Sequence, residues 1–204
     1  MTEGPYFVDG QMERSDIRTD PADGTVKEGV PLTLTILLSQ IADATCTPLP
    51  GATVDIWHCD AMGVYSGVTD PGFNTAGQSW LRGYQISDEN GRVEFTTIYP
   101  GWYSGRAVHI HFKIRTTVTG NETYEFTSQF FFDDALSDQV FTQAPYNSKG
   151  QRDTLNSNDF IFAGGGDQMI LNLSEANGGY ATTFEIALDL SDSQTGASDA
   201  AGQG

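Results

Sequence analysis

The chain has 204 residues and carries 27 acidic side chains against 10 lysines and arginines, which gives a formal net charge of −17. A surface this acidic repels nucleic acid and anionic lipid, so neither is predicted as a partner. The length suits a single domain, and the sequence contains no run of about 18 apolar residues that would predict a membrane-spanning helix.

The first 30 residues are polar and rich in turn-forming residues, so residues 1–30 are predicted to form an extended arm over the domain. The chain begins Met-Thr-Glu-Gly-Pro, without the basic and apolar pattern of a signal peptide. A cytoplasmic protein and a secreted protein that has lost its leader both fit this start. Cys46 and Cys59 lack metal-site spacing and define no disulfide framework, although one bridge between them is compatible with the sequence.

Short apolar and β-branched segments are separated by glycine-rich turns, a pattern typical of strands. The predicted strands are residues 32–38, 53–58, 83–86, 92–97, 108–115, 122–132, 169–173 and 180–190. Turn residues at 88–91 and at 120–121 predict two hairpins. Residues 60–79 are predicted to form a long functional loop, and residues 133–141 are the best candidate for a helix.

Many short strands and little helix predict an all-β fold, a β-sandwich of mixed, mostly antiparallel strands with long loops around its active site. We expect this domain to occupy residues 31–190. Residues 191–204 are small and polar and are predicted to be a disordered tail. N-glycosylation patterns begin at Asn121 and Asn172, and they matter only in a eukaryotic secretory host.

The densest group of chemically active residues lies in residues 98–114, which read IYPGWYSGRAVHIHFKI. On a strand, His109 and His111 point to the same side, while the apolar residues between and after them point to the other. Tyr103 and Arg106 precede them in a turn rich in glycine. Two parallel imidazoles beside a phenol predict a metal site, but these residues alone do not determine which metal.

This stretch resembles the metal-binding core of the intradiol ring-cleaving dioxygenases. The likeness continues upstream in residues 51–66, which include a second tyrosine, in Leu81-Arg82-Gly83 and in residues 97–103. It extends from about Glu3 to about Leu190. The family has a β-sandwich core, which agrees with the strand pattern. The chain shows no counterpart of the helical dimerisation segment that the family's catechol dioxygenases carry, and a homo-oligomer remains compatible with the sequence.

The resemblance implies that Tyr65, Tyr103, His109 and His111 bind one Fe(III) per chain. Two phenolates favour ferric over ferrous iron, because the ferrous oxygenase triad uses two histidines and a carboxylate. Two tyrosinates and a hydroxide neutralise Fe(III). A catecholate dianion keeps the site neutral if it replaces the hydroxide and one tyrosinate. The resemblance implies that Tyr103 is the tyrosinate that leaves and that Tyr65 stays.

The resemblance also implies the reaction and its remaining residues. A small aromatic diol would be cleaved by O2 between its two hydroxyl-bearing carbons, giving a cis,cis-muconate-type dicarboxylic acid. Arg106 would stabilise negative charge on the bound ring. Gln129 would support the site from a neighbouring strand. Trp102, Pro100 and Arg106 are predicted to contact the substrate.

Two other functions remain open from the residues themselves. A metal-free binding module could use the same sandwich to hold an aromatic compound or a glycan, but all four ligand positions are filled. A zinc or ferrous hydrolase or oxygenase would leave the two tyrosines unexplained. His58, beside Trp57 on a predicted strand, is interpreted as structural. Tyrosinate-to-ferric charge transfer would make the protein red-brown, whereas both alternatives predict a colourless protein.

Overall fold

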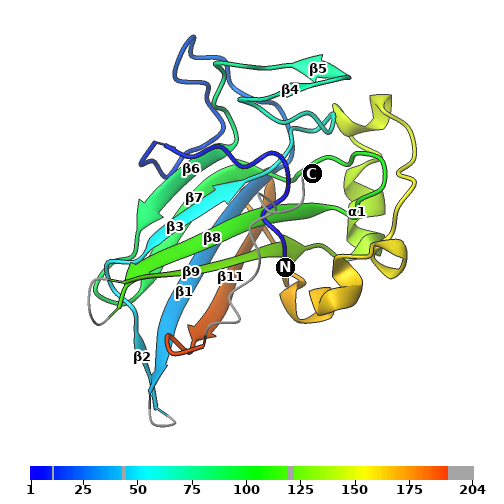
Figure 1. Cartoon of the computed structure of the whole chain (residues 1–204). Coiled ribbons are helices and arrows are strands. Elements are labelled where there is room, and N and C mark those ends of the chain that lie inside the picture. The colour runs from blue at the N-terminus through cyan, green and yellow to red at the C-terminus, as the bar shows by residue number, and fades with distance from the viewer. Residues whose placement is uncertain (11, 43–44, 119–121, 193–204) are drawn as a thin grey trace.

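The computed structural model describes residues 1–10, 12–42, 45–118 and 122–192 (Figure 1). One sheet has five strands, in which β1 pairs in parallel with β11 and antiparallel with β2 and β7. The remaining strand, β10, pairs antiparallel with β11. The bounds of these strands are Pro31–Ala42 for β1, Thr45–Pro48 for β2, Arg92–Ile98 for β7, Ser174–Ala176 for β10 and Gly179–Leu188 for β11.

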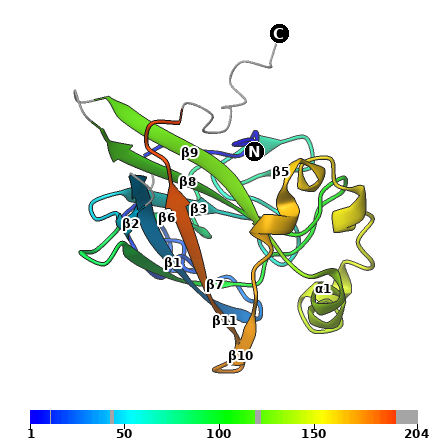
Figure 2. The same ribbon diagram turned by 90° about the horizontal axis from the view of Figure 1, so that it is seen from below.

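The second sheet has four antiparallel strands in the order β6-β3-β8-β9. Figure 2 shows the two sheets face to face, with β8 and β9 on one side and β1, β7 and β11 on the other. The strands are β3 (Thr53–Trp57), β6 (Arg82–Ile86), β8 (His109–Thr117) and β9 (Thr123–Phe131). A small hairpin of β4 (Thr69–Asp70) and β5 (Phe73–Asn74) lies above them in Figure 1.

The core fills the space between the two sheets, because each strand turns every second residue inward. From β1, the inward residues are leucines and an isoleucine, all with 1% exposure or less: Leu32, Leu34, Ile36 and Leu38. From the opposite sheet, Phe112 stacks on Phe130 with ring centroids 4.2 Å apart. The predicted all-β sandwich with mixed, mostly antiparallel strands is therefore confirmed.

Helices are short and lie beside one end of the sandwich (Figure 1). The helix α1 (Asp134–Val140) begins after Asp133, whose carboxylate accepts a hydrogen bond from the Leu136 N–H at 2.9 Å, close to the prediction of residues 133–141. The 3₁₀ turns are η1 (Tyr146–Ser148), η2 (Asn156–Asn158), η3 (Phe162–Gly164) and η4 (Gly166–Met169). No helix in the described part of the chain is long and apolar enough to cross a membrane.

The predicted strand at residues 169–173 is wrong. Four of its five residues are apolar, but Met169 ends the 3₁₀ turn η4, and the segment makes one isolated bridge, between Ile170 and Phe131. The strand lies further along, as β10, and a turn at Asn177-Gly178 with positive φ at both residues joins it to β11. Sequence analysis missed this hairpin, the strand β2, and the β4–β5 hairpin inside the predicted loop.

Several other predictions can be placed. Cys46 is exposed, Cys59 is buried and both are free, so the structure contains no bridge between them. The turn at 120–121, the glycosylation pattern at Asn121 and residues 193–204 of the predicted tail lie outside the described residues.

The face of the four-stranded sheet that points away from the core is covered by the beginning of the chain (Figure 1). Phe7 lies 4.9 Å from Trp57 of β3 between ring centroids, and Glu3 forms an ion pair of 3.0 Å with Lys113 of β8. This covered face, rather than the main core, is where the two histidines of β8 point.

Candidate metal centre

His109 and His111 lie on the same side of β8, as their spacing predicted, and their Nε2 atoms are 3.1 Å apart. The ring of His109 is fixed by its Nδ1–H, which donates to the carbonyl of Ala107 at 2.6 Å. In a neutral imidazole this leaves the lone pair on Nε2, facing its neighbours. His109 therefore presents the nitrogen that a metal ion requires.

His111 is positioned by packing instead. Its ring stacks on Trp57 with centroids 4.9 Å apart and planes 7° apart. A Cβ built on Gly4 would lie 3.0 Å from the His111 Cε1 atom, so the arm approaches the ring more closely than a larger residue would allow. The buried Nδ1 of His111 has no hydrogen-bond partner among the described residues.

Tyr65 reaches the histidines from the loop after β3. Asp60 shapes this loop, since its Oδ1 accepts hydrogen bonds from the N–H groups of Met62 and Val64. The Tyr65 side chain is completely buried and its Oη lies 3.4 Å from the Nε2 of His109. Arg82 donates to both Ser66, which follows Tyr65, and the carbonyl of Tyr6, so the loop is tied to the arm.

Tyr103 comes from the loop that precedes β8, and its Oη lies 3.2 Å from the Nε2 of His109. The two tyrosine loops are joined, because Gly101 N–H donates to the carbonyl of Asp60 at 3.1 Å. Gly101 is packed so closely against this carbonyl that a Cβ there would collide with it. Tyr103 itself is partly exposed, unlike Tyr65.

The environment keeps all four side chains uncharged in the absence of a cation. Burial lowers the pKa of His109 to about 3, and the nearby Arg106 charge lowers it as well. Burial, followed by His109 and Arg106, holds the pKa of His111 well below its usual range. Burial also raises the pKa of Tyr103 to about 12 and that of Tyr65 well above its ordinary value.

These residues fit a metal ion with anionic oxygen and neutral nitrogen ligands. Nitrogen ligands about 2.0–2.1 Å from one ion lie roughly 3 Å from each other. The measured separations of 3.1, 3.2 and 3.4 Å around the His109 Nε2 atom fall near this spacing. Two neutral imidazoles supply lone pairs, and a bound cation would offset the cost of ionising two buried phenols.

Arg106 lies beside this cluster with 11% of its side chain exposed. Its Nη2 donates to the Oε1 of Gln129 at 2.5 Å, and its Nε donates to the Oδ2 of Asp159 at 2.8 Å. Gln129 lies opposite His111 on β9, and its amide donates to the carbonyl of Thr2. The structure thus brings together all six predicted ligands and catalytic residues.

Pro100 and Trp102 are the other two residues predicted to contact the substrate. Pro100 is buried, and Trp102 packs against the main core, with the Lys149 ammonium 4.5 Å from its ring. His58 donates from Nδ1 to the carbonyl of Cys59 at 2.8 Å and accepts at Nε2 from the Thr97 hydroxyl at 2.7 Å. These bonds satisfy both ring nitrogens, in agreement with a structural role.

Sequence analysis missed three residues at the centre. Tyr6 stacks on Tyr65 with centroids 4.5 Å apart and donates its hydroxyl to Asp70 at 2.7 Å. Gly4 and Asp159 were missed as well. The positive φ of Gly4 gives no sequence signal beyond the residue itself, and Asp159 lies in an irregular segment without periodicity.

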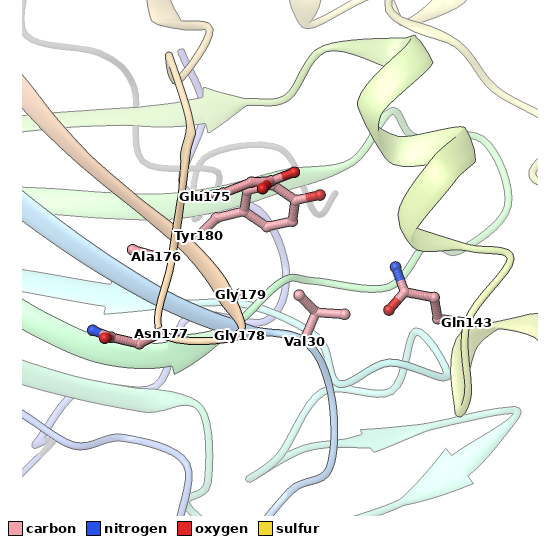
Figure 3. A pocket seen from close by; sticks show the side chains of 8 residues that line it. All are labelled: Val30, Gln143, Glu175, Ala176, Asn177, Gly178, Gly179 and Tyr180. Atoms are coloured by element: carbon pink, nitrogen blue, oxygen red, sulfur yellow. The ribbon is translucent and has the colours of Figure 1, made fainter.

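A separate hollow of about 380 Å³ lies beside the β10–β11 turn (Figure 3). It is lined by Val30, Gln143 and residues 175–180, and none of these is a predicted ligand or catalytic residue. Figure 3 labels Glu175 and Tyr180 among its lining residues, and these two residues pair across β10 and β11. The hollow contains no comparable group of metal-binding side chains, so the chemistry is concentrated in the tyrosine–histidine cluster.

Comparison with known proteins places this geometry in a family. A family model described as a dioxygenase matches residues 2–190. A catechol 1,2-dioxygenase from Acinetobacter baylyi is 37% identical over 106 residues, which cover 50% of this chain and 30% of that protein. The beta chain of a protocatechuate 3,4-dioxygenase from Burkholderia cepacia is 28% identical over 68% of this chain and 63% of its own length. The chain therefore spans less than two thirds of these curated relatives.

Solved structures match over more of their length. An intradiol ring-cleavage dioxygenase from Tetranychus urticae has a TM-score of 0.79 and 32% identity, with 93% of each chain covered. The dioxygenase domain of a dioxygenase and carbohydrate-binding fusion protein from Streptomyces sp. SirexAA-E has a TM-score of 0.63 and 28% identity, covering 92% of this chain and 94% of that one. The chain belongs to the intradiol ring-cleavage dioxygenase family.

Proposed function

We propose that this protein is a non-haem Fe(III) enzyme that cleaves a catechol-type ring between its two hydroxyl-bearing carbons, using O2 and giving a cis,cis-muconate-type diacid. The observation that carries the proposal is the convergence of two phenols and two imidazoles on one buried point. The names of the relatives, catechol 1,2-dioxygenase and protocatechuate 3,4-dioxygenase, support the reaction class.

Tyr65, Tyr103, His109 and His111 would hold one iron ion per chain. Ferric iron bound there would take both oxygens of a catechol and make the ring reactive towards O2. The donor set favours this metal over the alternatives, because phenols stand beside the two imidazoles where a ferrous oxygenase triad would have a carboxylate.

The two tyrosines have different surroundings, which suggests different roles. Tyr65 is completely buried and stacked on Tyr6, so its side chain has no room to leave. Tyr103 is partly exposed, and two exposed residues, Ser104 and Gly105, follow it. We therefore assign to the Tyr103 Oη the task of leaving the cluster and accepting a proton from the incoming catechol.

Arg106 supplies a fixed positive charge next to the place where the ring would lie. Its low exposure strengthens the electrostatic effect on negative charge that develops during the reaction. Gln129 orients the guanidinium from β9 and is itself oriented by the carbonyl of Thr2.

The test is oxygen uptake by the iron-loaded protein with a panel of catechol, protocatechuate, hydroxyquinol and lignin-derived catechols. We expect one O2 to be consumed per ring cleaved and, with ¹⁸O2, label in both carboxyl groups of the product. No uptake across the panel, or a product opened beside the two hydroxyls rather than between them, would overturn the proposal. The panel also identifies the preferred substrate.

A further inference from the structure

We propose that Asp159 is a positioning residue, which acts by orienting the guanidinium of Arg106 towards the reacting ring. This inference rests on the proposed function, because it concerns how that reaction's charged residue is held. No hydrogen bond or ion pair among the described residues joins Asp159 to the four predicted ligands, and its charge reaches His109 only through space. Its side-chain ion pair is with Arg106, so we assign its main influence to that residue.

The guanidinium is held from two sides. Asp159 Oδ2 accepts from Nε at 2.8 Å, and Gln129 Oε1 accepts from Nη2 at 2.5 Å. The two acceptors bind different nitrogens of one planar group, so together they restrict both its position and its rotation. The Asp159 side chain is fully buried, which makes this a shielded ion pair.

Asp159 is itself held rigidly. Its Oδ2 also accepts from the N–H of Ala107 at 2.7 Å, and its Oδ1 accepts from the N–H groups of Ile161 and Phe162 at 2.7 and 3.0 Å. Burial raises the pKa of the carboxyl, but hydrogen bonds from Phe162 and Ala107 and the charge of Arg106 bring it below its usual range. The carboxylate is therefore a fixed, charged anchor.

The two hydrogen bonds fix the position of the positive charge of Arg106. With Nε bonded to Asp159 and Nη2 bonded to Gln129, the guanidinium is held in one orientation beside the tyrosine–histidine cluster. Without Asp159, a guanidinium on a flexible side chain would sample several positions, and misplacement by about 1 Å can cost about 10²-fold in rate.

The first test is a double-mutant cycle with Asp159→Asn and Arg106→Ala in the iron-loaded protein. We expect Asp159→Asn to lower kcat by roughly 10- to 100-fold in the wild-type background and by less than about twofold in the Arg106→Ala background. An equal loss in both backgrounds would show a general structural role and overturn the proposal.

The matched control is Asp153→Asn. Asp153 also bonds the catalytic loop, accepting from the N–H of Gly105 at 3.2 Å, but it does not contact the Arg106 guanidinium. We expect kcat within about twofold of wild type for this variant, since a local backbone bond at the surface contributes little. A loss as large as that of Asp159→Asn would mean that any weakening of the loop suffices, which contradicts the proposal.

The second readout needs no turnover. Phenylglyoxal modifies accessible arginines, and mass spectrometry of the iron-free protein gives the rate at each site. Asp159→Asn should speed modification of Arg106 at least about threefold, while Arg152, which is 3% exposed and paired with Asp134 and Asp138, should be unchanged as an internal control. An unchanged Arg106 rate would overturn the proposal.

A third variant covers a failure to fold. Asp159→Glu keeps the charge but displaces the carboxylate by one methylene, so we expect Arg106 reactivity and kcat between those of wild type and Asp159→Asn. If phenylglyoxal modifies Arg106 at the expected rates but the protein cleaves no catechol, the proposed function is refuted and the positioning role stands. An active wild type whose Asp159 variants retain full kcat would refute the positioning role alone.

Discussion

His58 gives a prediction about pH and stability that follows from its surroundings. The ring is completely buried, and its two nitrogens are already engaged by the carbonyl of Cys59 and the hydroxyl of Thr97. A second proton would have to be added to Nε2, which accepts from Thr97, and the resulting charge would lie in an apolar environment. Protonation of His58 should therefore oppose folding.

The magnitude can be worked out from the pKa. Burial lowers the pKa of His58 to about 4, whereas an unfolded chain protonates at about 6.5. Between these values the unfolded state binds more protons, so stability is complete above pH 6.5 and falls as the pH decreases towards 4. From about pH 7 to about pH 5, this one residue should reduce the free energy of unfolding by about 2 kcal/mol.

The assay is urea unfolding of the iron-free wild type and of His58→Gln at several pH values between these limits. The variant should be less stable at neutral pH, because buried hydrogen bonds are lost, by about 1–3 kcal/mol. The difference between the two proteins should then shrink by about 2 kcal/mol at the acidic end. Parallel pH profiles would refute the reasoning, since they would mean that His58 titrates alike in folded and unfolded chains.

Three further predictions concern the site. Arg106→Ala should keep iron and colour and lose about 10²- to 10³-fold in kcat, with partial recovery in Arg106→Lys; full turnover in the alanine variant would remove Arg106 from the mechanism. Tyr103→Phe should bind iron and form a catecholate complex slowly, whereas Tyr65→Phe should bind iron poorly. Metal analysis and visible spectra measure both effects, and the reverse result would mean that the roles of the two tyrosines are exchanged. Gly101→Ala should lower iron content and thermal stability, because the added Cβ would collide with the loop that carries Tyr65. In the control Gly105→Ala, the added Cβ meets no atoms and costs only about 1–2 kcal/mol of backbone strain. Equal effects of the two substitutions would refute this packing argument.

The parts of the fold that alternate regularly could be predicted from sequence. The strand carrying His109 and His111 was placed within two residues, because its apolar residues point to one side and its imidazoles to the other. A short apolar run misled at residues 169–173, where Met169 ends a 3₁₀ turn and no strand ladder forms. Alternation shows which side chains are buried together, and it does not show whether a neighbouring strand is available.

The candidate site was less accessible to such reasoning. Resemblance to the family brought Tyr65 together with Tyr103, although 38 positions separate them and no local pattern connects two loops. The packing of His111 against both Trp57 and Gly4 depends on how the arm crosses the sheet. The Asp159 contact depends on a long irregular connection whose path is set by many hydrogen bonds, so it appears only in three dimensions.

The most direct test of the central claim is the iron content and visible spectrum of the purified protein beside those of His109→Ala and His111→Ala. The account predicts about one iron per wild-type chain, with a red-brown colour from tyrosinate-to-ferric charge transfer, and loss of both iron and colour in each variant. Far-ultraviolet circular dichroism would verify that the variants remain folded. Full iron occupancy in either folded variant, or a colourless iron-loaded wild type, would contradict the assignment of this cluster as the ferric centre.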